Sequence, residues 1–229
     1  MAQNLFRTSL SREIGVITFG SSSSYLANNE RPLEEAQFTR SDLSGQLTGY
    51  SKDKRKQVLL ARRLDMCPGT PIVKSIMLSN LIALVSEVTG LNSKHLIPEA
   101  VRRVEDAIEL KSLMVVVPSS PNVSREFTSA RDIAKWLIGS LKDREKWPPV
   151  LNLGSGNVLY VKNVYESASK VLGFEGHFMY SPLKSKGPRA RVLDSSIASD
   201  NFEWQPNDNV ENIMQDYLLA VGRTHGNRA

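Results

Sequence analysis

The sequence predicts an α/β fold with a largely parallel sheet, because short apolar runs alternate with helical segments over most of the chain. The runs expected to form strands lie at 15–19, 71–78, 113–117 and 150–153. Helices are expected in an N-terminal segment and at 52–64, 96–110, 130–141, 161–172 and 210–220. Breaks rich in proline, glycine and serine separate these elements, and the polar stretch 31–49 is expected to be a loop.

The composition describes an ordinary globular chain with enough apolar residues for a core. Of its 229 residues, 41% are hydrophobic, which suits one domain or two small ones. The single cysteine, Cys67, excludes an internal disulfide and favours a reducing compartment. No apolar run reaches the length of a membrane span, and the N-terminus lacks a signal-peptide core. We therefore expect a cytoplasmic protein.

The net charge of +5 favours an anionic partner, such as nucleic acid, a membrane surface or a phosphorylated metabolite. Basic residues occur in small scattered groups without interleaved aromatic side chains, which argues against nucleic acid. Three histidines and one cysteine, far apart in sequence, form no metal-ligand pattern. We expect a phosphate-bearing small molecule as partner, with no nucleic acid, membrane or metal.

Three residue types in order predict acid–base chemistry. Ser21 directly follows the first predicted strand, and Tyr50 and Lys54 lie four residues apart at a helix start, so they share a face. An ammonium beside a phenol favours the phenolate, and a serine hydroxyl can bind the same substrate oxygen. Together they could transfer a proton at a carbonyl or carbinol. Each feature alone is commonplace, because a serine after a strand often serves only the turn.

In this order, the residues resemble the extended short-chain dehydrogenase/reductase (NAD-dependent epimerase/dehydratase) family, especially its GDP-fucose synthase branch. The resemblance implies catalytic roles for Ser21, Tyr50 and Lys54, the last two also contacting NADP. Tyr25 matches a family tyrosine four residues after the serine. Ser23 replaces a family cysteine between them and would contact the substrate.

Further matches follow along nearly the whole chain. The stretch 92–98 resembles a family segment that carries the second acid–base residue, which implies that role for His95, with Arg103 assisting it. The segments around Arg125 and Arg191 resemble family landmarks, and the resemblance implies that both arginines bind the substrate diphosphate. Plainer interpretations stay open: His95 could cap the following helix, and Arg103 could lie on a solvated helix face.

The family's Gly-x-x-Gly-x-x-Gly turn, which binds the NADP pyrophosphate, has no counterpart here. The Gly154-Ser155-Gly156 stretch lacks the rest of such a fingerprint and is interpreted as a turn. Asn80 matches a cofactor-binding position, so NADP is implied only by resemblance. The expected fold is an incomplete Rossmann-like parallel sheet, without the first strands and glycine-rich turn, plus a small C-terminal α/β substrate domain.

We expect residues 1–82 with 128–153 to form the Rossmann remnant and 83–127 with 154–229 the substrate domain. A shortened sheet exposes an edge strand, which self-association or a partner chain would cover. Three functions compete. The chain could act within a split nucleotide-sugar epimerase/reductase that uses GDP-4-keto-6-deoxymannose and NADPH. It could instead be an inactive GDP-sugar-binding relic or partner protein, or a cofactor-free epimerase.

Overall fold

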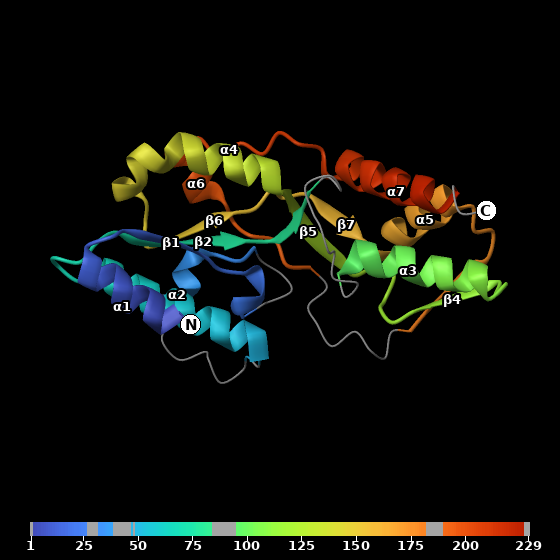
Figure 1. The fold of residues 1–229 in the computed structure, drawn as a ribbon, viewed down its shortest axis with the longest axis horizontal. Coiled ribbons are helices and arrows are strands. Elements are labelled where there is room, and N and C mark those ends of the chain that lie inside the picture. Colours follow the sequence, from blue (N-terminus) through green and yellow to red (C-terminus); the bar gives the residue numbers. More distant parts are fainter. Residues whose placement is uncertain are drawn as a thin grey trace.

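The computed structural model describes residues 2–26, 32–38, 47, 49–83, 95–181 and 190–226, the last seven of these and residue 2 as backbone only. The motif residues 92–94 and 187–189 lie outside the described residues, as does most of the 31–49 stretch. Within the described part, the predicted α/β class is confirmed (Figure 1).

A first parallel sheet has the strand order β1-β2-β6 and confirms three predicted strands. Its strands are β1 (Val16–Phe19), β2 (Val73–Leu78) and β6 (Val150–Leu153). Val16 pairs with Val73, and Ser75 with Val150. All six residues of β2 are buried, because this central strand has a neighbour on each side and a helix layer on each face.

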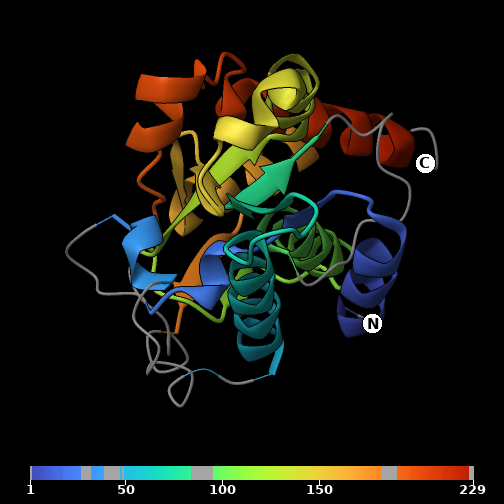
Figure 2. The same cartoon turned by 90° about the vertical axis from the view of Figure 1, so that its left-hand side faces the viewer.

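Helices cover both faces of this sheet, so it forms the middle of three layers (Figures 1 and 2). On one face lie α1 (Ala2–Arg12) and α2 (Gly49–Asp65), and Phe6 of α1 packs with Val73. On the other lie α4 (Ala130–Ser140), α6 (Ser196–Phe202) and the 3-10 helix η5 (Leu141–Lys146). There Trp136, Trp147 and Trp204 pack against Ile76 and Leu151.

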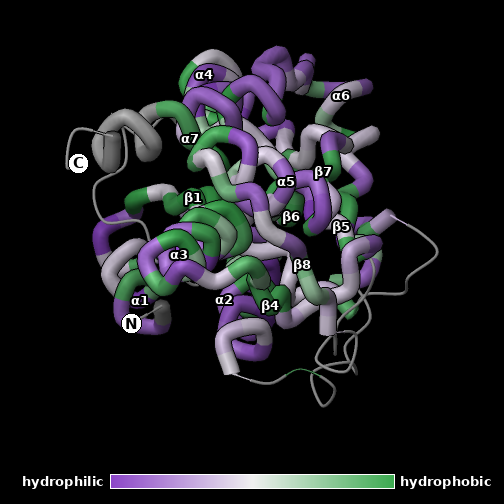
Figure 3. Tube along the Cα trace, turned by 90° about the vertical axis from the view of Figure 1, so that its right-hand side faces the viewer, coloured by the Kyte–Doolittle hydropathy of each residue, from purple (hydrophilic) through white to green (hydrophobic). Residues whose placement is uncertain are grey.

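The remaining strands form two smaller sheets. In one, β5 (Ser124–Ser129) pairs in parallel with β3 (Asn80–Ile82) and antiparallel with β7 (Val158–Tyr160). In the other, β4 (Met114–Val117) and β8 (His177–Tyr180) run parallel. The helices α3 (Leu96–Glu109), α5 (Val161–Leu172) and α7 (Val210–Gly226) share a core with them. Figure 3 shows the alternation of hydrophobic and hydrophilic positions on α3 that turns one face to this core.

Two departures from the sequence prediction lie close to the candidate site. The loop expected at 31–49 contains a 3-10 helix, η2 (Glu35–Phe38), whose Phe38 is buried against the Tyr25 ring. The strand β5 was not predicted, because its sequence SREFTS shows no apolar run or alternation. It is nonetheless almost wholly buried, since it pairs on both sides and its polar groups find hydrogen-bond partners.

Candidate functional site

A serine turn follows the carboxyl end of β1, where a parallel sheet places its functional residues. Ser21 begins the 3-10 helix η1 (Ser22–Ser24), and its hydroxyl accepts the N–H of Ser23 at 3.2 Å. The Ser21 and Ser23 hydroxyl oxygens are 2.9 Å apart. The two hydroxyls singled out from the sequence therefore lie together, half-buried, and Ser21 also serves the turn itself.

The helix α2 places Lys54 beside this turn. Its ammonium donates to the carbonyl oxygen of Phe19 at 2.8 Å, two residues before Ser21. The same nitrogen lies 5.8 Å from the centre of the Tyr50 ring, as expected for side chains four residues apart on one helix face. Tyr50 is 63% exposed, so its phenol faces solvent rather than the interior. The proposed roles of Tyr50 and Lys54 stay predictions.

Two arginines from distant parts of the chain influence each other electrostatically, and one of them contacts the serine turn. Arg191 donates to the carbonyl oxygen of Ser22 at 3.1 Å, whereas Arg125, on β5, donates to that of its neighbour Ser124 at 2.8 Å. Burial lowers the pKa of both guanidinium groups, and the positive charge of Arg191 lowers the pKa of Arg125 further. Two half-buried like charges create a positive potential that an anion would relieve.

The neighbouring residue Glu126 is a fully buried carboxylate held by backbone amides. One oxygen accepts the N–H of Gly156 at 2.9 Å, and the other accepts that of Leu193 at 3.0 Å. Gly154 packs so closely that a Cβ there would lie 2.4 Å from the carboxylate. Desolvation by burial raises the pKa of Glu126 from its ordinary value of 4.5 to about 7, although these amide hydrogen bonds oppose the rise.

The raised pKa of Glu126 predicts a pH dependence of stability. Between 4.5 and about 7, the folded protein holds a proton on Glu126 that the unfolded chain has lost. Lower pH therefore favours folding in this window, and the free energy of unfolding should fall as pH rises through it. The Glu126 contribution is about 1.4 kcal/mol per pH unit and on the order of 3 kcal/mol in all.

Urea unfolding from about pH 5 to about pH 8, with wild type and Glu126→Gln side by side, measures this slope. All other titrating groups are present in both proteins, so the difference between the two curves isolates Glu126. Two parallel curves would contradict the prediction.

A buried asparagine joins the segment that carries Arg191 to Leu33 and Tyr25. Asn152, at 0% exposure on β6, donates to the carbonyl oxygens of Leu33 at 2.7 Å and Asp194 at 2.8 Å. Its side-chain oxygen accepts the hydroxyl of Tyr25 at 2.5 Å. Leu33 in turn pairs with the 192–194 stretch through two backbone hydrogen bonds. Asn152 thus fixes the stretch that directly follows Arg191.

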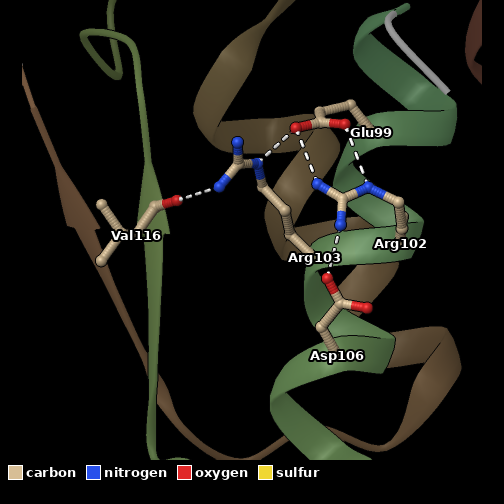
Figure 4. A network of polar contacts seen from close by, with 5 residues as sticks. All are labelled: Glu99, Arg102, Arg103, Asp106 and Val116. Atoms are coloured by element: carbon tan, nitrogen blue, oxygen red, sulfur yellow. Dashed lines mark hydrogen bonds and ion pairs between the residues drawn. The ribbon is translucent and has the colours of Figure 1, made fainter.

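His95 is the exposed N-cap residue of α3, and Arg103 lies on that helix. The contacts described for Arg103 are with α3 and β4 and not with the serine turn (Figure 4). His95 occupies the N-cap position but makes no side-chain capping bond, so the capping interpretation is wrong. Arg103 donates to Glu99 at 2.6 Å and to the carbonyl oxygen of Val116 at 3.1 Å. Arg102 binds both Glu99 and Asp106. None of these described contacts tests the roles predicted for His95 and Arg103.

The same network sets the charge of Glu99 (Figure 4). Partial burial alone would raise the pKa of Glu99, but hydrogen bonds and charge from Arg102 and Arg103 more than offset it, and the pKa is lowered. Glu99 is thus ionised at neutral pH and holds the Arg103 guanidinium against β4.

Asn80, the predicted cofactor-binding residue on β3, donates to the backbone carbonyl of Glu126 at 2.8 Å. Glu126 and Asn152 were not predicted as determinants of the site, because most of their partners are backbone groups far away in sequence. The position of Glu126 directly after Arg125 was the one available hint for that residue.

The residues that the structure describes contain no cluster of three histidine, cysteine, aspartate or glutamate side chains suited to a metal ion. Among the described helices, none is long and apolar enough to cross a membrane.

Comparison with known proteins gives a consistent set of relatives, although no protein-family model matches the chain. The GDP-L-fucose synthase of Azorhizobium caulinodans is 27% identical over 212 residues, covering 92% of this chain and 67% of the relative. The GDP-L-colitose synthase of Yersinia pseudotuberculosis is 25% identical over 189 residues, covering 82% of this chain and 61% of the relative. The chain thus spans about two thirds of the length of these curated relatives.

Solved structures show the same fold at low identity. The GDP-L-fucose synthetase of Naegleria fowleri bound to NADP superposes with a TM-score of 0.77 at 15% identity, covering 98% of this chain and 71% of that one. The NADP-bound GDP-mannoheptose C4 reductase of Campylobacter jejuni gives 0.73 at 16% identity, covering 97% and 72%.

These relatives and the shared fold support the resemblance of the chain to the extended short-chain dehydrogenase/reductase family, the NAD-dependent epimerases and dehydratases. Within that family, the chain is similar to GDP-L-fucose and GDP-L-colitose synthases. The family resemblance predicted from the Ser21, Tyr50 and Lys54 pattern is thereby confirmed, whereas the roles of the individual residues stay predictions.

Proposed function

We propose that the chain binds a GDP-linked sugar and serves a nucleotide-sugar epimerase/reductase. The observation that carries this proposal is that Arg191 contacts the serine turn and its charge acts on the half-buried Arg125. Guanidinium groups bind phosphate oxygens in paired, charge-assisted hydrogen bonds, and two of them suit a diphosphate. The sequence relatives include synthases of GDP-linked sugars, which supports the guanosine diphosphate moiety.

The sugar would then lie toward the serine turn. Ser21 and Ser23 present two adjacent hydroxyls for a sugar oxygen. Tyr50, with Lys54 beside it, would give a proton to that oxygen. His95, assisted by Arg103, would exchange protons at the carbons next to a keto group.

The residues described here do not fit a complete NADP site. Tyr50, Lys54 and Asn80 could contact a nicotinamide, but a cradle of backbone amides for the pyrophosphate is also needed. The amides of the Gly154–Gly156 turn already have partners, since Gly154 donates to the Ser195 hydroxyl, Ser155 to the Thr128 hydroxyl and Gly156 to Glu126. No hydride step is therefore assigned to this chain alone.

The first sheet also supports a partner chain. Within the described residues, β1 pairs with β2 on one side only, and Phe19 at its end is 42% exposed. We infer that a second copy or another chain covers this edge, since unpaired strand edges invite strand addition. In the same proposal, residues 1–82 with 128–153 form the Rossmann remnant, and 83–127 with 154–229 form the substrate part.

Calorimetric titration with GDP-mannose tests the diphosphate site. Arg191→Met, which keeps the chain length but removes the charge, should weaken binding about 10- to 100-fold, because a charge-assisted hydrogen bond is lost. Arg191→Lys should recover only part of the affinity, since an ammonium cannot bind in a bidentate way. The control is Arg63→Met on the exposed face of α2. Equal affinity in Arg191→Met and wild type would refute the site.

Turnover assays with a GDP-4-keto-6-deoxyhexose separate the three functions. A reductase consumes NADPH, whereas a cofactor-free epimerase moves solvent deuterium into the sugar with no NADPH present. A relic or partner protein binds GDP-sugar without either change. Light scattering on the same samples shows whether a second chain is bound, as the open β1 edge predicts.

A further inference from the structure

We propose that Glu126 is a positioning residue that sets Arg191 against Arg125 so that the pair can hold a diphosphate. Glu126 touches neither the arginine side chains nor the serine turn in the described contacts; it acts through the backbone of residue 193. The inference rests on the proposed function, since Glu126 would position an arginine of the proposed diphosphate site.

The geometry links one carboxylate to three segments. Glu126 lies on β5 directly after Arg125, and successive side chains on a strand point to opposite faces. Arg125 is therefore directed away from the carboxylate, while Glu126 reaches inward to the amides of Gly156 and Leu193. Leu193 lies two residues after Arg191, so the same hydrogen bond fixes the stretch that delivers Arg191 to Ser22.

The ionised form is the one that suits this task. A carboxylate is acceptor-only and can receive an N–H at each oxygen, whereas a protonated carboxyl turns one oxygen into a donor. The carboxylate is buried among backbone groups. The charged residues on the segments that it contacts are Arg125 on β5 and Arg191 and Asp194, which flank Leu193. Glu35 reaches the same region through the amide of Asn152.

Holding this charge costs stability, because burial raises the pKa of Glu126. A neutral glutamine of the same shape would avoid that cost, so the carboxylate is placed at the expense of folding. Residues that build a ligand site often lower the stability of the folded protein in this way.

Titration of GDP-mannose across about pH 6 to 8 tests the inference, because its diphosphate is substituted at both ends and keeps its charge in this range. Wild type should lose about tenfold in affinity toward the lower pH as one amide hydrogen bond is released. Glu126→Gln should bind about tenfold more weakly at the higher pH, with a flat profile. The control Glu145→Gln lies on the exposed surface of η5 and should match wild type.

A second variant keeps the carboxylate but displaces it. Gly154→Ala places a Cβ 2.4 Å from a Glu126 oxygen and 2.9 Å from the Leu193 Cβ, so it should weaken GDP-mannose binding while Glu126 remains ionisable. Circular dichroism establishes that both variants are folded. An unchanged affinity and pH profile in Glu126→Gln would overturn the inference.

Amide hydrogen exchange, followed by NMR, separates failure of the inference from failure of the proposed function. The Leu193 and Gly156 amides should exchange faster in Glu126→Gln than in wild type. In wild type, their exchange should slow less, as pH falls, than the exchange of amides that do not bind Glu126. If wild type did not bind GDP-mannose, the proposed function would be wrong, and the exchange of these amides would decide whether Glu126 holds the stretch around Leu193. Unchanged exchange at Leu193 in Glu126→Gln would overturn the inference about Glu126.

Discussion

Replacing Asn152 by leucine is expected to lower the free energy of unfolding by about 2 to 6 kcal/mol, a large part of the stability of an ordinary domain. The leucine has nearly the same size but cannot donate to the carbonyl of Asp194 or accept the hydroxyl of Tyr25, whereas the Leu33 carbonyl keeps the N–H of Asp194. Each buried group left without a partner costs about 1–3 kcal/mol. Urea unfolding followed by tryptophan fluorescence measures the loss.

The matched control for this substitution is Asn201→Leu on α6. Asn201 also donates to a backbone carbonyl, that of Ile197 at 3.0 Å, but the bond is exposed to water. Water replaces the lost partner there, so the change should stay within about 0.5 kcal/mol. A cost below about 1 kcal/mol for Asn152→Leu would mean that water or a shifted backbone can satisfy the same groups.

Trp204→Ala is expected to cost about 5 kcal/mol, through two separate effects. The indole is 2% exposed and packs edge-on against Trp136 with ring centres 6.1 Å apart, so its removal leaves a large cavity. Its N–H also donates to the carbonyl oxygen of Gly154 at 2.7 Å, which ties α6 to the turn around Glu126. Thermal and urea unfolding together measure the combined loss.

A pair of phenylalanine substitutions separates the hydrogen bond from the packing. Trp204→Phe leaves the Gly154 carbonyl without its donor, whereas the buried N–H of Trp147 has no hydrogen-bond partner among the described residues. Trp147→Phe should therefore cost less than Trp204→Phe by about 1 kcal/mol or more. Equal costs would show that the Trp204 bond contributes nothing beyond packing.

The local pattern of the sequence was sufficient for the elements whose burial shows as apolar runs or helical periods. The strands β1, β2, β4 and β6 and the helix α3 begin and end within a few residues of their predicted bounds. By contrast, β5 was overlooked because a strand paired on both sides can bury serine, threonine and glutamate when each finds a partner. The capping role suggested for His95 was wrong, because occupying the N-cap position does not oblige a side chain to bond there.

The sequence by itself determined the α/β class, the family resemblance, and the residue types available for acid–base chemistry, because these depend on local periodicity and on order along the chain. Only the tertiary structure decided that Arg191 contacts the serine turn and that its charge acts on Arg125. It also decided that Glu126 and Asn152 bind the stretch that contains Arg191, at Leu193 and Asp194. Such contacts join residues far apart in sequence through backbone amides and carbonyls. Every residue type carries those groups, so no sequence pattern marks which of them a buried carboxylate or amide will bind.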